Sequence, residues 1–197
     1  MKEVRTIKER VYSRYLQKKG ASKLSDWKNI LTLLKTSEGK PEALDDMVVL
    51  DLSYANFSGN IAASFLAEAG AEVIKVEPPE GDPSRVISPY GANVQGVGIP
   101  YLMESRNKRQ ITLDLESPEG RENLKRLAKR ADMLIETFTP GQMDTWGIGY
   151  RQLRDLNPGL IYIAISPYGH YTAKGKEMAE MPWTDLTSQA ESGLAAL

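Results

Sequence analysis

The sequence has no cysteine, a single histidine and almost no excess of either charge. Without cysteine there is no disulfide framework, no thiolate zinc site and no cysteine nucleophile. One histidine cannot build a multi-histidine metal centre, and we expect no bound metal. The 25 Lys and Arg against 26 Asp and Glu leave a formal net charge of −1, which creates no field that would attract nucleic acid.

Long apolar runs are also missing. Every apolar stretch falls far short of the roughly 20 residues that a transmembrane helix needs, so we expect no membrane partner. Residues 1–15 are rich in charge and lack the apolar core of a secretory signal. We therefore expect a cytoplasmic protein, and the absence of cysteine is compatible with a reducing compartment.

The G-x-G-x-x-G, P-loop and G-x-S-x-G motifs are absent. This removes the usual signatures of dinucleotide redox chemistry, P-loop phosphoryl transfer and α/β-hydrolase catalysis. A Ser-His-Asp arrangement would have to use His170, the sole histidine. His170 follows an apolar run in the turn Pro167-Tyr168-Gly169-His170, and we interpret it as a surface residue rather than a catalyst.

Residues 1–46 differ in composition from the rest of the chain. Apolar residues recur every three or four positions within residues 4–19, which predicts a helix with a narrow apolar stripe. A second helix is predicted to begin at Ser25, a favourable N-cap residue. We interpret residues 1–46 as a helical N-terminal extension. It either packs on its own domain or serves as a docking arm for a partner chain.

From residue 47 onward, short apolar runs alternate with helical patterns. Almost continuous apolar runs suit strands that are covered on both faces. The alternation predicts an α/β fold, with a doubly wound, Rossmann-like parallel sheet flanked by helices over residues 47–197. Ligands of such sheets bind beyond the carboxyl ends of the strands. The predicted strands are 47–52, 72–76, 110–115, 132–136 and 160–166, and the predicted helices are 59–69, 117–130, 141–146 and 150–156.

Three segments are candidates for anion binding or acid chemistry. The run Arg106-Asn107-Lys108-Arg109 is either a solvated turn or a phosphate site. Residues 137–141 follow a predicted strand and lead into a helix, so their backbone N–H groups can face an anion. Asp185 lies beside Trp183 and is either a carboxylate with a raised pKa or a helix N-cap.

A set of short motifs resembles the class III CoA-transferases, also called the carnitine dehydratase / bile-acid-inducible F family. The resemblance begins at Val49-Leu50-Asp51-Leu52 and covers residues 47–197, and the ordered combination makes it specific. The further motifs are Gly70-Ala71-Glu72-Val73-Ile74-Lys75-Val76-Glu77-Pro78-Pro79, Asn107-Lys108-Arg109, Ser117-Pro118-Glu119-Gly120, Glu136-Thr137-Phe138-Thr139-Pro140-Gly141, Trp146-Gly147-Ile148-Gly149-Tyr150 and Ile165-Ser166-Pro167-Tyr168-Gly169.

The resemblance implies a large domain that binds coenzyme A (CoA) and exchanges it between an acyl-CoA and a carboxylic acid. An aspartate attacks the thioester to give an anhydride, and the CoA thiolate then forms an aspartyl-CoA thioester. It also implies a homodimer or a heteromer with a related chain. The residues that it places near CoA are Ala55, Asn56, Phe57, Lys75, Asn107, Lys108, Arg109, Thr137, Phe138, Pro140, Gly141 and Met143, with Asp185 as a supporting catalytic residue.

Departures from the family pattern limit these expectations. The resemblance places the nucleophilic aspartate beyond Gly193 and past Leu197, so we expect this N-terminal portion of the large domain to be inactive alone. An α-methylacyl-CoA racemase would carry a histidine where Thr184 stands. A non-catalytic CoA-binding subunit of a heteromer, and a Rossmann-like binding domain unrelated to CoA, remain as alternatives. The acid substrate stays open.

Overall fold

The computed structural model describes residues 42–178, 181 and 185–193. The chain divides into two compact units, residues 1–41 and residues 42–197. The helices predicted within residues 1–41 lie outside the described residues, and the role of residues 1–46 stays a prediction. Residues 42–46 form turns in the second unit, where the Leu44 N–H donates to the Ala69 carbonyl (3.0 Å). No helix in the described ranges is long and apolar enough to cross a membrane.

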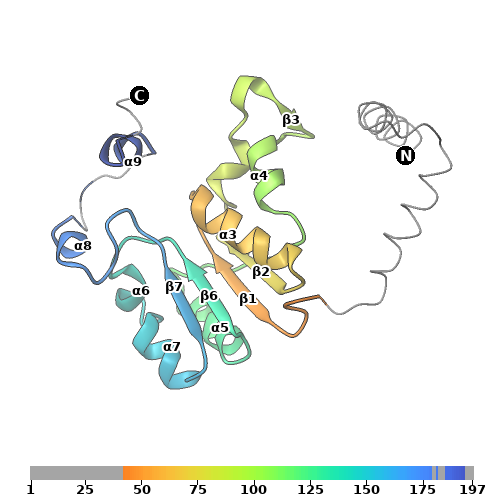
Figure 1. The fold of residues 1–197 in the computed structure, drawn as a ribbon. Helices are drawn as coiled ribbons and strands as arrows, with labels where there is room; N and C mark the ends of the chain where they lie inside the picture. The colour runs from red at the N-terminus through yellow and green to blue at the C-terminus, as the bar shows by residue number, and fades with distance from the viewer. Residues whose placement is uncertain (1–41, 179–180, 182–184, 194–197) are drawn as a thin grey trace, which may run out of the picture. The chain divides into compact units, whose positions relative to one another are not determined.

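A parallel five-stranded sheet forms the centre of the second unit (Figure 1). The strands are β1 (Val48–Leu52), β2 (Glu72–Glu77), β5 (Arg109–Thr112), β6 (Met133–Glu136) and β7 (Ile161–Ala164). They lie in the order β5-β2-β1-β6-β7, and every neighbouring pair is parallel. From β1 the chain adds β2 and then β5 on one side, and it then returns to add β6 and β7 on the other side of β1. This is the doubly wound arrangement that the sequence predicts.

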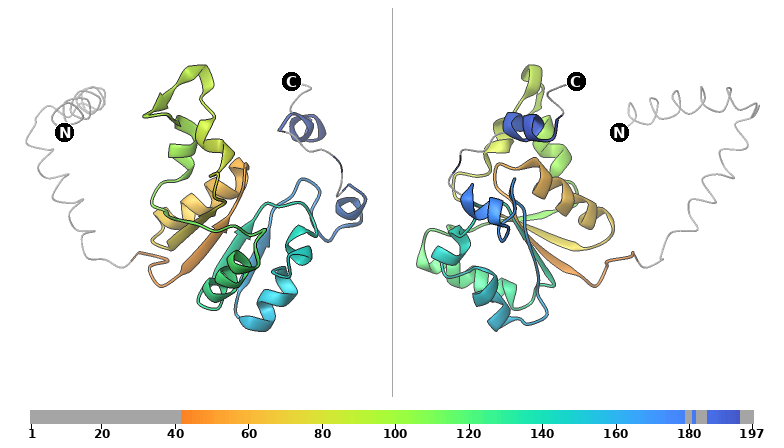
Figure 2. Two further views of the ribbon diagram at one scale, coloured as in Figure 1. Left: turned by 180° about the vertical axis from the view of Figure 1, so that it is seen from behind. Right: turned by 60° about the vertical axis from the view of Figure 1, so that its left-hand side comes forward.

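Helices cover both faces of the sheet (Figure 2). Because side chains alternate along a strand, Val49 packs on one face with α3 (Phe57–Glu68), while Leu50 packs on the other face. That second face is covered by α5 (Pro118–Ala128), α6 (Gln142–Thr145) and α7 (Tyr150–Leu156). Burial on both faces explains why the strands appear in the sequence as nearly continuous apolar runs.

The two longer helices begin where their capping residues allow. Asn56 accepts a hydrogen bond from the Gly59 N–H (3.1 Å) at the start of α3. Ser117 accepts one from the Gly120 N–H (3.0 Å) at the start of α5, and Pro118 takes the first helical position. Each cap satisfies a backbone donor that would otherwise have no partner within the helix.

The stretch from residue 78 to residue 100 is built from short elements. It contains 3-10 turns at Pro83–Val86 and Pro89–Gly91, and the hairpin of β3 (Asn93–Val94) and β4 (Val97–Gly98). The helix α4 (Ile99–Glu104) then follows it. Two-residue strands are too short to show periodicity. The hairpin turn uses Gln95 and Gly96 at φ 54° and 84°, so a glutamine takes a left-handed position that asparagine usually occupies.

The remaining elements lie towards the C-terminus. They are α8 (Ala173–Glu177) and α9 (Asp185–Glu191). Predicted strands 110–115 and 160–166 are shorter in the structure, ending at Thr112 and Ala164. The residues that follow those two strands turn away into loops at the carboxyl edge of the sheet, which is where a ligand is expected.

Leu134 tests the packing of the sheet against α5. Its side chain is fully buried in β6, whereas Leu186 of α9 is 70% exposed. We expect Leu134→Ala to lower the free energy of unfolding by about 2–5 kcal/mol, because it leaves a cavity in the core. Leu186→Ala, the matched control, should change it by less than about 0.5 kcal/mol. Urea denaturation measures both, and equal losses would contradict this packing.

Candidate functional site

The candidate site lies where the strand order reverses, between the carboxyl ends of β1 and β6. Two loops meet there, residues 53–56 and residues 137–141. The Thr137 hydroxyl oxygen accepts a hydrogen bond from the Tyr54 N–H (3.0 Å), which ties the loops together. Gly59 makes this approach possible, because a Cβ there would lie 2.2 Å from the Ser53 Oγ and 2.7 Å from the Thr137 Cγ2.

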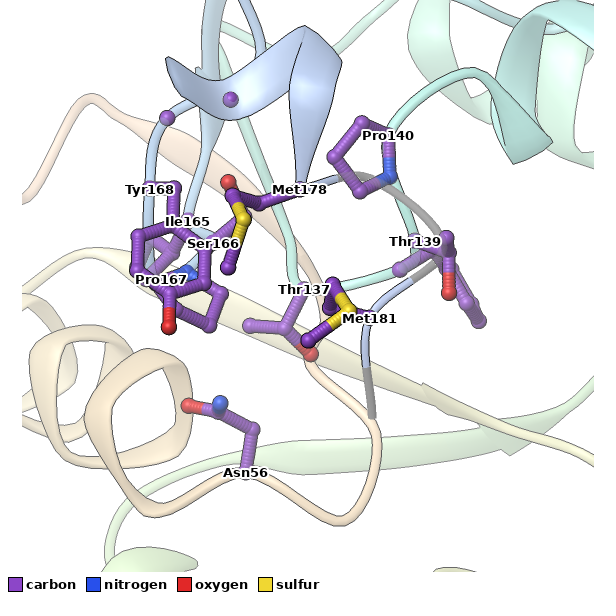
Figure 3. A pocket seen from close by; sticks show the side chains of 13 residues that line it. Asn56, Thr137, Thr139, Pro140, Ile165, Ser166, Pro167, Tyr168, Met178 and Met181 are labelled. Atoms are coloured by element: carbon purple, nitrogen blue, oxygen red, sulfur yellow. The ribbon is translucent and has the colours of Figure 1, made fainter. Parts of the chain in front are cut away.

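Two pockets open on either side of the Thr137–Thr139 segment. The first pocket, of about 350 Å³, lies between this segment and the loop that follows β7 (Figure 3). Asn56, Ser166 and Met178 are among its lining residues. The second pocket, of about 530 Å³, lies above β1, β2 and β6 and is also lined by Pro78. Because Thr137, Phe138 and Thr139 line both, one extended ligand can occupy both pockets.

The second pocket is aromatic on one side and acidic on another. The rings of Tyr54 and Phe138 stack at 6.5 Å, and Phe138 meets Trp146 edge to face at 5.2 Å. The described lining also holds four carboxylates, and it contains no lysine or arginine. These acids are Glu77, Glu80, Asp114 and Glu116. Such a pocket favours a flat, uncharged ring that carries hydrogen-bond donors.

A buried ion pair holds the loop that follows β1. The Lys75 ammonium lies 3.1 Å from Asp82 Oδ2 and donates to Asn60 Oδ1 (2.7 Å) and to the Ser53 carbonyl. The other oxygen of Asp82 accepts the N–H of Ala55 (3.3 Å). Burial alone would raise the pKa of Asp82, but Lys75 and hydrogen bonds from Ser84 hold it below its ordinary value. The network fixes Ala55 at φ 49°, a conformation that non-glycine residues rarely adopt.

A second buried ion pair joins the same region to β1. Lys108 lies 2.7 Å from Asp51 Oδ2 and donates to the Asn60 carbonyl (2.7 Å), and both charged side chains are at most 1% exposed. Burial lowers the pKa of Lys108, although Asp51 opposes this shift. Glu104 lies in the same cluster, and burial, reinforced by Asp82, raises its pKa to about 7. The Glu104 Oε2 has no hydrogen-bond partner among the described residues.

A third network, at the end of β2, holds the side chain of Glu77, which lines the second pocket. Arg85 donates from Nε and Nη2 to the two carboxylate oxygens of Glu77, at 2.7 and 3.1 Å. Tyr101 donates its hydroxyl to Glu77 (2.5 Å), and the Arg85 guanidinium lies 4.3 Å from the centre of its ring. Burial and the bond to Glu77 raise the pKa of Tyr101 to about 12. Glu77 is therefore held in place where β2 ends.

Glu136 ends β6 as a buried carboxylate, 1% exposed. Its Oε2 accepts the Phe138 N–H (2.7 Å), and its Oε1 accepts the Tyr162 hydroxyl (3.3 Å). Burial raises the pKa of Glu136 to about 7, and Asp144 adds to the shift. The His170 Nδ1 lies 3.8 Å from Glu136 Oε1, and the His170 side chain is only 9% exposed. The interpretation of His170 as a surface residue is therefore wrong.

The structure brings part of the expected site together. Asn56, Thr137, Phe138 and Pro140 line the first pocket. Several other expected contacts lie beside these. Ala55 precedes Asn56, Phe57 begins α3 with a 58% exposed ring, and Gly141 caps α6 at φ 89°.

Other expected ligand contacts point elsewhere. Lys75 and Lys108 are buried in ion pairs, so their ammonium groups serve protein acceptors rather than a phosphate. Asn107 and Arg109 lie at the amino end of β5, opposite the pockets, where Arg109 pairs with Glu72 at 3.0 Å. Met143 is 3% exposed and belongs to the core.

Asp185 begins α9, and its side chain lies outside the described part of the chain. Sequence reasoning did not single out Tyr54, Trp146 or Glu136. The signal for Glu136 was available, because a carboxylate directly after the apolar run Met133-Leu134-Ile135 marks the carboxyl end of a buried strand.

The buried carboxyl of Glu104 generates a prediction on pH. The folded chain holds the Glu104 proton up to about pH 7, while the unfolded chain releases it near the ordinary value of 4.5. Between those values the folded state binds more protons, so this group lowers stability as the pH rises. We expect Glu104→Gln to raise the free energy of unfolding by about 1–2 kcal/mol at pH 8, and by less at pH 5.

Urea denaturation at both pH values measures this difference. Glu122→Gln is the control, because Glu122 is an exposed carboxylate paired with Lys125 on α5. That variant should show no gain in stability at pH 8. A Glu104→Gln protein that is equally or less stable than the wild type at pH 8 would show that Glu104 is ionised without cost in the folded chain.

Comparisons with known proteins identify the family of this chain. The family model described as "CoA-transferase family III" matches residues 44–197. Succinyl-CoA–D-citramalate CoA-transferase from Chloroflexus aurantiacus is 44% identical over 135 residues, which cover 68% of this chain and 33% of that protein. Succinyl-CoA:(R)-benzylsuccinate CoA-transferase subunit BbsE from Thauera aromatica is 38% identical over 137 residues, covering 68% and 32%.

A solved structure shows the same fold. The crystal structure of a CaiB/BaiF family protein from Brucella suis superposes with a TM-score of 0.70 at 36% identity, covering 78% of this chain and 40% of that one. The chain thus spans between a third and two fifths of the length of the relatives it matches. A family match over most of the chain, relatives above 30% identity and a shared fold lead to one conclusion. The chain belongs to CoA-transferase family III.

Proposed function

We propose that residues 47–197 belong to the CoA-binding portion of an enzyme that transfers CoA from an acyl-CoA to a carboxylic acid. The observation that carries this proposal is the pair of pockets on either side of the Thr137–Thr139 segment, at the point where the strand order reverses. The family's CoA chemistry and the location of ligands in doubly wound sheets support the same assignment.

The second pocket suits the adenosine end of CoA. Stacked rings at Tyr54 and Phe138 offer apolar faces to a purine. The carboxylates of Glu80, Asp114 and Glu116 can accept hydrogen bonds from an exocyclic amine and from ribose hydroxyls. An acidic lining opposes a phosphate, so the charged part of CoA lies outside this pocket.

The first pocket suits the pantetheine arm and the thioester. It begins at the Thr137–Thr139 segment and continues past Asn56 to the loop after β7, where Ser166 and Met178 line it (Figure 3). Its mixed polar and apolar lining fits an amide-containing chain. Asn56 points into this space from the end of the β1 loop, so its side-chain amide lies beside the path of the ligand.

The chemistry follows from the resemblance. A carboxylate attacks the thioester carbonyl and expels the CoA thiolate, which gives an acyl-aspartyl anhydride. The thiolate then attacks the aspartyl carbonyl, releases the first acid and forms an aspartyl-CoA thioester. The incoming carboxylate repeats the sequence in reverse and leaves as the new acyl-CoA. The resemblance places this nucleophilic aspartate past Leu197, and Asp185 is proposed as a supporting residue.

The proposal includes a second chain that contributes to CoA binding. The described lining of both pockets holds no lysine or arginine that could neutralise the phosphates of CoA. We propose that cations come from another chain, either in a homodimer or in a heteromer with a related chain. The cytoplasm, where acyl-CoA and carboxylic acid would meet, stays the expected compartment.

A non-catalytic CoA-binding subunit is the second candidate function. The relative from Thauera aromatica is named as a subunit, which favours a heteromeric assembly. In that case this chain would bind CoA while a related chain supplies the nucleophile. The racemase alternative has less support, because Thr184 has no useful pKa near neutrality for proton transfer.

Phe138→Ala tests CoA binding in the two pockets. We expect the Kd for CoA to rise about tenfold, because stacking of a base on an aromatic ring is worth about 1–3 kcal/mol. Phe65→Ala is the matched control, since Phe65 on α3 is 61% exposed and lines neither pocket. Isothermal titration calorimetry gives both constants. No saturable CoA binding by the wild type would sink the proposal itself.

A second prediction concerns activity. We expect the purified 197-residue chain to bind CoA but to transfer none between succinyl-CoA and a carboxylic acid. The physical reason is that the proposed covalent steps need a carboxylate nucleophile that the resemblance does not place in this sequence. Chromatographic detection of new acyl-CoA measures transfer, with succinate and oxalate as test acids. Multiple turnovers by the chain alone would contradict the assignment.

A further inference from the structure

Glu136, Tyr162 and His170 form a buried group that the proposed covalent chemistry does not use. They come from the end of β6, from β7 and from the loop after β7. The carboxylate accepts the tyrosine hydroxyl (3.3 Å), and the imidazole Nδ1 lies 3.8 Å from the same oxygen. That second separation is too long for a hydrogen bond but within the range of an ion pair. The His170 Nε2 is buried without a partner among the described residues.

This group is connected to the ligand-facing segment by one bond. The second carboxylate oxygen of Glu136 accepts the Phe138 N–H at 2.7 Å. The Phe138 ring stacks on Tyr54 and lines both pockets, so its backbone position sets the shape of both. A hydrogen bond to an ionised carboxylate is about twice as strong as one to a neutral acid. The charge on Glu136 therefore decides how firmly Phe138 is held.

We propose that Glu136 is a positioning residue for CoA, whose ionised carboxylate holds the Thr137–Thr139 segment in its binding conformation. The inference rests on the proposed function, since it concerns the same pockets. Burial makes the group responsive near neutral pH, because it raises the pKa of Glu136 to about 7 and lowers that of His170.

The charged surroundings fit this role. From β7 Glu136 meets Tyr162, and from the following loop it meets His170 and Tyr171. From α6 it meets Asp144, whose negative charge opposes ionisation of Glu136 and favours a protonated His170. No lysine or arginine in the described residues pairs with Glu136. Because burial lowers the pKa of His170, the imidazole is mostly neutral where Glu136 titrates, and burial and Asp144 dominate that titration.

The first measurement follows the Phe138 amide without any ligand. In ¹⁵N–¹H spectra of the full chain, we expect the Phe138 amide proton to shift downfield between pH 6 and pH 8, because its acceptor becomes charged. In Glu136→Gln the acceptor stays neutral, and the shift should disappear. A Phe138 resonance that does not titrate in the wild type would overturn the proposal, even if the variant failed to fold.

The second measurement is the Kd for CoA at pH 6 and pH 8. A CoA phosphate gains charge in this range, so variants are compared at each pH. We expect Glu136→Gln to bind about fivefold more weakly than the wild type at pH 8 and equally at pH 6, because it resembles the protonated acid.

Glu122→Gln is the control, an exposed carboxylate of α5 that lines neither pocket. It should match the wild type at both pH values. Equal losses at pH 6 and pH 8 in Glu136→Gln would mean a merely structural role and would overturn the proposal. Absence of CoA binding by the wild type would instead reject the proposed function, while the Phe138 titration would still decide this inference.

Discussion

The ion pair between Lys75 and Asp82 holds the loop after β1, and both pockets depend on that loop. Lys75 projects from β2 into the interior and reaches the Ser53 carbonyl and Asn60 as well as Asp82. The same aspartate fixes the N–H of Ala55, whose left-handed backbone costs about 1 kcal/mol or more. Tyr54 and Asn56, on either side of Ala55, line the second and the first pocket. The shape of the site thus depends on one buried charge pair.

Burying so many charges beneath one loop adds little net stability. Desolvation of two ions roughly cancels their attraction, and hydrophobic residues of similar size would often do as well. The pairs Lys75–Asp82 and Lys108–Asp51 instead select one arrangement of the loop. Any other arrangement that left one of these buried charges unpaired would strongly destabilise the folded chain. Both lysines also bond to Asn60, through its side chain and its carbonyl. The network therefore joins β1, β2, α3 and the start of β5 at one point.

The sequence predicted the fold well, but it did not predict the ion-pair partners of its buried lysines. Apolar runs such as residues 48–50 and caps such as Ser117 act locally, so strands and helices could be predicted from neighbouring residues. Thr137 and Phe138 were found because strand ends are where ligands bind. Lys75 and Lys108 were expected near CoA from the resemblance, since a lysine in a sequence does not show which way its side chain points. In the structure Lys75 pairs with Asp82 and Lys108 with Asp51, which lie 7 and 57 residues away in the sequence. Short elements such as β3 and β4 gave no periodic signal at all.

The charge distribution around the pockets carries a consequence for the proposed function. Two of the cations expected near CoA, Lys75 and Lys108, are paired inside the protein with Asp82 and Asp51. The second pocket is instead lined by carboxylates, including Glu77, which Arg85 and Tyr101 hold in place. This surface can select a neutral base and ribose but not attract a polyanion. If CoA binds here, its phosphates lie outside the described lining of both pockets, and cations supplied by another chain, as proposed, would couple affinity to assembly. Binding would then strengthen the contact between chains by the same factor by which that contact strengthens binding.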